Sequence, residues 1–159
     1  MKKILQILTV VLTMSIFQNA NAQLSHWEIG IRFPENTGID LTIPVGLKPR
    51  LHPTVYLERF GVGTYFDWMF ELTGKNSVQG LKFYPGVGPE MFFEGRFDFA
   101  VAGNFGAEYS FKFPLTIGFD WRPAMRFTND FDFQTGNWGL IARFRFGEGT
   151  SFKRTSNTN

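Results

Sequence analysis

The chain has 159 residues, enough for one domain, and it has no cysteine, which excludes disulfide bonds and thiolate metal sites. Two of its 16 Lys and Arg residues, Lys2 and Lys3, lie in the N-terminal segment described next, so the remaining 14 balance the 14 Asp and Glu residues. This balance leaves no basic excess for binding nucleic acid, and we predict no nucleic-acid partner.

The first 22 residues have the features of a secretory signal peptide. Lys2 and Lys3 precede an apolar run, and Ala20 and Ala22 form a small-x-small cleavage site. The apolar run is too short to span a bilayer as a helix. We therefore predict a cleaved signal peptide over residues 1–22, export of the mature chain, and a first mature residue near Gln23. The alternative is an uncleaved N-terminal anchor.

The rest of the chain is a series of segments in which apolar and polar residues alternate, which is typical of strands with one apolar face. This pattern predicts eight strands, over residues 26–33, 39–45, 51–58, 60–72, 81–94, 96–112, 113–127 and 137–146. The fifth contains Pro85 and Pro89, and because proline cannot donate to a ladder, we predict a bulge or break near residues 86–88. Residues 128–136 form the longest predicted loop, and residues 147–159 a polar, disordered tail.

Eight amphipathic strands with short connections and no helical signal predict an all-β fold, an eight-stranded antiparallel up-and-down β-barrel over residues 23–146. The apolar face is too rich in aromatic rings to fit the interior of such a barrel; one strand alone carries Phe97, Phe99, Phe105 and Phe111. Glycine and alanine lie on the polar face, where space is short. We therefore predict a transmembrane barrel whose apolar face contacts lipid.

The polar face carries acidic and basic residues, which a narrow lumen would bring together as ion pairs because unpaired buried charge is costly. We predict a structural charge network made of Glu28, Arg32, Asp67, Glu108, Asp120, Arg122, Arg126, Arg143 and Arg145. Within it, Asp120 is expected near Arg143 or Arg145. The paired charges are expected to plug the lumen, so we predict no stable open channel. Arg50 is assigned to a turn over residues 46–50.

The sequence offers little for catalysis. The chain has two histidines, His26 and His52, and neither occurs in a nucleophile motif. Ser25 adjoins His26, but neighbouring strand residues point to opposite faces. We predict no catalytic residue, no cofactor and no metal site, and we interpret the histidines as lumen or rim residues.

The segments GIDLTIP, FGVGTYFDW, FYPGVG and PLTIGFDWRP, with the terminal RFRFG, resemble small outer-membrane β-barrel proteins of Gram-negative bacteria, the OmpA-, OmpX- and OmpW-like eight-stranded group. The resemblance implies a monomer in outer-membrane lipid that the barrel assembly machinery inserts. Two features depart from the group: residues 147–159 follow Phe146, where such chains usually end, and the connections are short on both sides.

These observations predict a non-enzymatic protein with a structural or interaction role in the outer membrane. Two alternatives stay open. One is a narrow transport barrel for a small or hydrophobic solute. The other is a soluble, lipocalin-like lipid-binding barrel, in which the aromatic face would point inward.

Overall fold

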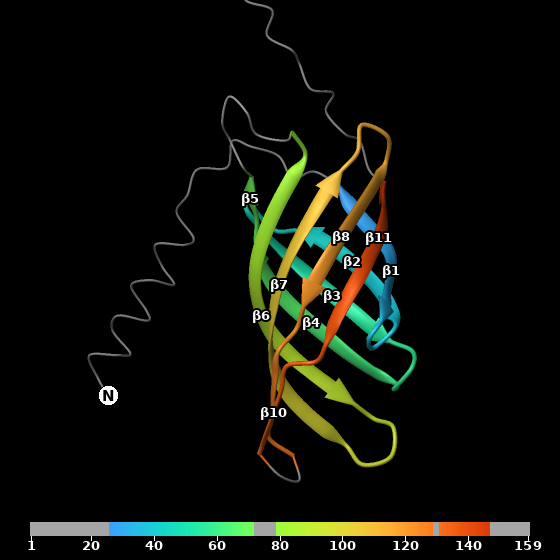
Figure 1. Cartoon of the computed structure of the whole chain (residues 1–159), viewed down its shortest axis with the longest axis vertical. Coiled ribbons are helices and arrows are strands. Elements are labelled where there is room, and N and C mark those ends of the chain that lie inside the picture. The colour runs from blue at the N-terminus through green and yellow to red at the C-terminus, as the bar shows by residue number, and fades with distance from the viewer. Residues whose placement is uncertain (1–25, 72–78, 129–130, 147–159) are drawn as a thin grey trace, which may run out of the picture.

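Alternation of apolar and polar residues produces strands that curve into a closed, eight-stranded antiparallel barrel (Figure 1). The computed structural model describes residues 26–71, 79–128 and 131–146, and this part of the chain is all-β. The predicted signal peptide and the predicted C-terminal tail lie outside the described residues. Within the described ranges, no helix is long and apolar enough to cross a membrane.

The barrel is formed by strands joined in the order of the sequence. They are β1 (Trp27–Pro34), β2 (Gly38–Pro44), β3 (Pro49–Tyr56), β4 (Gly61–Trp68), β6 (Leu81–Phe92), β7 (Asp98–Ser110), β8 (Leu115–Trp121) and β11 (Trp138–Phe146). Each pairs antiparallel with its neighbours in this order, and β1 closes the barrel against β11, from Trp27 opposite Phe146 to Pro34 opposite Gly139. The predicted up-and-down barrel is thus confirmed.

Three short strands, β5 (Phe70–Glu71), β9 (Ala124–Arg126) and β10 (Asp132–Gln134), extend the barrel wall. β5 continues β4 along β6, and β9 continues β8 along β7. β10 lies inside the segment 128–136, which was predicted to be a loop, and it pairs with β9. The prediction of a loop over the whole of this segment was therefore wrong. Three residues are too few to produce a readable alternation.

The prediction of a bulge or break in the fifth strand was also wrong. β6 pairs with β7 without a slip from Leu81 opposite Tyr109 to Phe92 opposite Asp98. Its register with β4 is the same on both sides of Pro89. Both Pro85 and Pro89 point to the exposed outer face, so their rings need no space in the lumen. A missing N–H then interrupts the ladder locally without shifting it.

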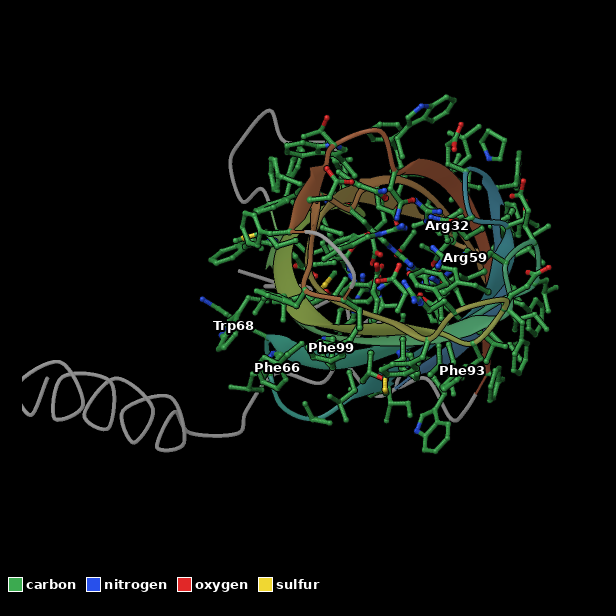
Figure 2. All side chains as sticks on the ribbon, turned by 90° about the horizontal axis from the view of Figure 1, so that it is seen from below. Arg32, Arg59, Phe66, Trp68, Phe93 and Phe99 are labelled. Carbon is green, nitrogen blue, oxygen red and sulfur yellow. The ribbon has the colours of Figure 1, made fainter. Side chains whose placement is uncertain are left out.

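The apolar face of every barrel strand points outward. Figure 2 shows Trp68 and Phe93 pointing away from the barrel, whereas Arg32 and Arg59 point into it. Phe105, which is 46% exposed, represents the many large apolar residues on the outside. The alternative in which the aromatic face points into the barrel is therefore wrong.

Small residues make room for large side chains in the lumen. A Cβ atom on Gly106 would lie 2.2 Å from the ring of Tyr84, and one on Gly139 would lie 2.7 Å from the guanidinium of Arg32. Both glycines are needed because an arginine or a tyrosine from an adjacent strand occupies the space in front of them. The expected placement of small residues on the inner face is confirmed.

Candidate functional site in the barrel interior

The interior of the barrel is filled by polar and charged side chains rather than by an apolar core. Each of the eight barrel strands contributes at least one buried acidic or basic side chain to the interior. The buried acidic and basic residues are Glu28, Arg32, Asp40, Arg50, His52, Asp67, Glu90, Asp98, Glu108, Asp120, Arg122 and Arg143. The interior is therefore the place where any function of the polar residues must be sought.

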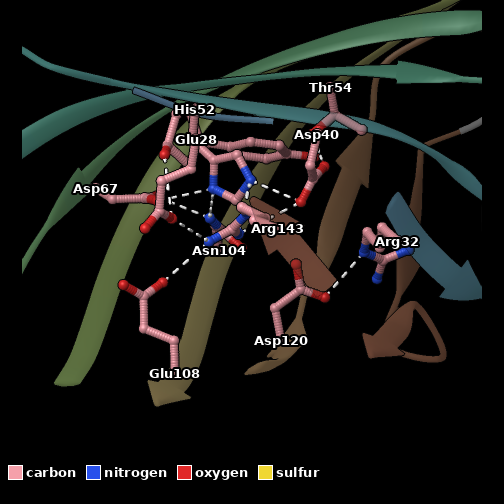
Figure 3. Close-up of polar contacts among 12 residues, drawn as sticks. Glu28, Arg32, Asp40, His52, Thr54, Asp67, Asn104, Glu108, Asp120 and Arg143 are labelled. Carbon is pink, nitrogen blue, oxygen red and sulfur yellow. Dashed lines mark hydrogen bonds and ion pairs between the residues drawn. The ribbon is translucent and has the colours of Figure 1, made fainter. Parts of the chain in front are cut away.

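His52 lies at the centre of this interior, between two carboxylates (Figure 3). Its Nδ1 is 2.8 Å from Oδ2 of Asp67, and its Nε2 is 2.9 Å from Oδ2 of Asp40. The Nδ2 of Asn104 donates to Oδ1 of Asp67 at 2.7 Å. These four residues come from β2, β3, β4 and β7, so the cluster ties together four strands of the barrel.

Asp40 extends the cluster to the opposite wall. Its Oδ1 accepts a hydrogen bond of 2.7 Å from Thr54, and its Oδ2 accepts one of 3.4 Å from NH2 of Arg143. Arg122 lies 3.5 Å from the same carboxylate. NH1 of Arg143 in turn donates to Oε2 of Glu108 at 3.0 Å. Charges of opposite sign thus alternate through the lumen.

Asp120 forms the second centre of the network. Its Oδ1 accepts from Nε of Arg32 at 2.9 Å, and its Oδ2 lies 2.7 Å from NH2 of Arg122. All three side chains are fully buried. One carboxylate therefore compensates two guanidinium groups in a part of the barrel closed to solvent.

The predicted pairing of Asp120 with Arg143 or Arg145 was wrong. On the neighbouring strand β11, Asp120 lies opposite Gly139, whereas Arg143 lies opposite Thr116. The connection from β8 to β11 contains the β9–β10 hairpin. The number of residues in this connection therefore does not determine the register between β8 and β11. Gly139 has no side chain, and this lets an arginine from β1 reach Asp120 instead.

A tyrosine pair and a phenylalanine fill the barrel toward the β3–β4 connection. The hydroxyls of Tyr56 and Tyr65 both donate to Oε1 of Glu90, the former at 2.7 Å. The ring of Phe92 stacks on Tyr56 with a centroid distance of 5.2 Å. The guanidinium of Arg59 lies 4.6 Å from the centroid of the Phe92 ring. These contacts close the lumen at this end.

The structure brings most of the predicted network together. Seven of the predicted residues are buried in one connected cluster: Glu28, Arg32, Asp67, Glu108, Asp120, Arg122 and Arg143. Arg126 instead lies at the end lined by Phe92 and pairs with Asp98 at 3.2 Å. Arg145 lies at the opposite rim, where its NH2 donates to the backbone oxygen atoms of Phe111 and Phe113.

The network also contains residues that were not among the predicted members, and Asp40, Arg50, His52 and Asn104 are examples. Arg50 was assigned to a turn because Pro49 precedes it. His52, Thr54 and Tyr56 alternate along the inner face of β3. Two residues before His52, the same alternation places Arg50 inside the barrel. The sequence therefore held the signal that would have found it.

The central residues of the network are closed to solvent. Asp40, His52 and Asp67 are each fully buried, so no substrate reaches them without the network opening. Within the described part of the chain, no group of three His, Asp or Glu side chains is placed to hold a metal ion.

Comparisons of the chain with protein-family models, with curated proteins and with solved structures found no match.

Proposed function

We propose that this protein is an outer-membrane β-barrel with a non-enzymatic, structural or interaction role in the cell envelope. The observation that carries the proposal is the reversed distribution of polarity. Large apolar side chains such as Phe105 and Phe119 are exposed, whereas Arg32 and Asp120 are fully buried. A soluble monomer does not tolerate a continuous apolar surface of this extent, and a hydrocarbon environment does.

Exposed aromatic residues at both ends of the barrel support a bilayer as that environment. Trp27 and Trp68 lie at the end where β1 begins, and Phe60 and Phe93 lie at the opposite end, with their ring centroids 6.0 Å apart. All four are exposed, by 38% to 56%. Aromatic residues at both ends of an apolar band are typical of the two interfaces of a membrane.

The biogenesis that we propose follows from the sequence. A signal peptide over residues 1–22 would export the chain, and the barrel assembly machinery would insert it as a monomer into outer-membrane lipid. Residues 147–159 follow the last strand, so recognition of that strand would have to occur at an internal position. The resemblance to the OmpA-, OmpX- and OmpW-like group belongs to this proposal as well.

Cell fractionation tests the location. We expect a tagged chain expressed in a Gram-negative host to be recovered with the outer membrane, to require detergent for extraction, and to migrate differently on a gel before and after boiling. A chain lacking residues 1–22 is the matched control and is expected to stay in the cytoplasm. Folded protein in the periplasm that is soluble without detergent would contradict the proposal.

Transport of a small solute is the second candidate function, and electrical recording separates it from the first. Because Arg122, Arg143 and Tyr65 are fully buried across the lumen, we expect the refolded wild-type protein to show no large, persistent conductance steps in planar bilayers. A known open porin, recorded in the same bilayers, is the positive control. Stable conductance steps in the wild type would place transport ahead of the structural role.

A further inference from the structure

A pocket opens into the barrel at the end where β1 begins and β11 ends. Its volume is about 50 Å³, and the residues that decide its chemistry are His26, Glu28, Arg50, Lys82, Glu108 and Arg145. A cavity that holds one water molecule needs roughly 10–15 Å³. The pocket therefore has room for a small polyatomic ion and not for a large organic ligand.

The acidic residues of this pocket already have partners among the neighbouring side chains. Oε2 of Glu108 accepts from NH1 of Arg50 at 2.9 Å and from NH1 of Arg143 at 3.0 Å. Glu28 accepts from the hydroxyl of Thr116 at 2.9 Å and lies 3.7 Å from NH1 of Arg143. The lining of the pocket thus contains three basic residues, Arg50, Lys82 and Arg145, and two carboxylates that already have partners.

The basic residues of the pocket can still donate hydrogen bonds to a ligand. Arg50 is only 5% exposed, and its Nε and NH1 are bonded to Asp67 and Glu108, but its NH2 has no hydrogen-bond partner among the described residues. Lys82, whose side chain is 16% exposed, has an ion pair of 3.6 Å with Glu71, whose side chain is 65% exposed. Because the carboxylate is solvated and the distance is long, this pair contributes little, and the ammonium group can bind a second acceptor.

Arg145 adds a second guanidinium at the rim. Its NH2 bonds backbone oxygen atoms of the β7–β8 turn, and no ion pair joins it to a carboxylate of the described residues. Hydrogen bonds to carbonyl oxygen atoms fix the position of the guanidinium but do not neutralise its positive charge. Among the residues that the structure describes, the side chain is thus held at the pocket without a counterion.

We infer that this pocket binds a phosphate-type oxoanion between Arg50, Lys82 and Arg145. Guanidinium and ammonium groups are the preferred donors to phosphate oxygen atoms, and charge-assisted hydrogen bonds of this kind are the strong ones. Arg50 belongs to the pocket lining and has a donor, its NH2, without a partner among the described residues, and Lys82 and Arg145 supply further positive charge. The inference depends on the barrel and its rim, not on the membrane location proposed above.

Calorimetric titration of inorganic phosphate into the refolded protein tests this inference, in a detergent and a buffer that contain no phosphate or sulfate. We expect saturable binding at one site. Arg145→Gln and Lys82→Gln are each expected to weaken it about tenfold or more, because each removes a charge-assisted contact. The matched control is Arg59→Gln, which removes an equal charge at the opposite end, where Asp98 keeps Arg126 as a partner.

The outcomes separate the possibilities. Absence of saturable phosphate binding in the wild type overturns the inference, as does an equal loss of affinity in Arg59→Gln, which would indicate attraction by overall charge. Heat-dependent gel migration verifies folding, and if one rim variant does not fold, the other decides. Displacement of bound phosphate by a short-chain phosphatidic acid, but not by the matching diacylglycerol, identifies a lipid headgroup as a source; without displacement, the ligand is a soluble oxoanion.

Discussion

Replacing Asp120 with alanine should lower the free energy of unfolding by about 3–5 kcal/mol, the usual cost of removing one partner from a buried ion pair. The carboxylate lies 2.9 Å from Nε of Arg32 and 2.7 Å from NH2 of Arg122, and all three side chains are fully buried. Arg122 would keep the carboxylate of Asp40 at 3.5 Å, but Arg32 would keep only neutral partners such as Asn137. The substitution therefore leaves the buried guanidinium of Arg32 without a carboxylate that compensates its positive charge.

Reversible urea unfolding in lipid vesicles, followed by tryptophan fluorescence, measures this loss. Glu58→Ala is the matched control, because Glu58 is exposed and accepts a weak 3.4 Å hydrogen bond from the backbone N of Thr37. We expect the control to change the free energy of unfolding by less than about 0.5 kcal/mol. A loss of under about 1 kcal/mol in Asp120→Ala would show that the network does not hold the barrel together.

Phe105→Arg is expected to impair insertion and folding by about 2–4 kcal/mol, the cost of an arginine at mid-depth on the lipid face of a barrel. Phe105 lies in the middle of β7, is 46% exposed, and has its ring centroid 5.9 Å from that of Trp121. The prediction follows from the proposed membrane location, because an arginine at an exposed position costs little in water.

The folded fraction of Phe105→Arg, measured by heat-dependent gel migration after refolding into vesicles, gives the result. Phe105→Leu keeps an apolar side chain at the same position and should fold like the wild type. Asn104→Ala is no neutral comparison, since Asn104 is fully buried and donates to Asp67 at 2.7 Å. If the arginine variant inserts as well as the leucine variant, the outer face of β7 does not contact hydrocarbon.

The sequence by itself determined the strands and the direction of their side chains. Successive residues of a strand point to opposite faces, so the alternation around Phe105 and Glu108 already assigned one to the outside and the other to the lumen. It also identified most charged members of the interior. Predictions from the alternation failed next to prolines. Arg50 follows Pro49 and was assigned to a turn, although it points into the barrel, and Pro89 suggested a bulge that β6 does not have.

Which charges pair was decided only by the tertiary structure. The partners lie far apart in the chain, such as Arg32 and Asp120 or Arg50 and Glu108, and they meet because the barrel closes β1 against β11 and brings opposite walls together. A shift of two residues in the register of one strand keeps every side chain on its face but changes all of its partners. Face is therefore a property of the local sequence, whereas pairing depends on the closed barrel as a whole.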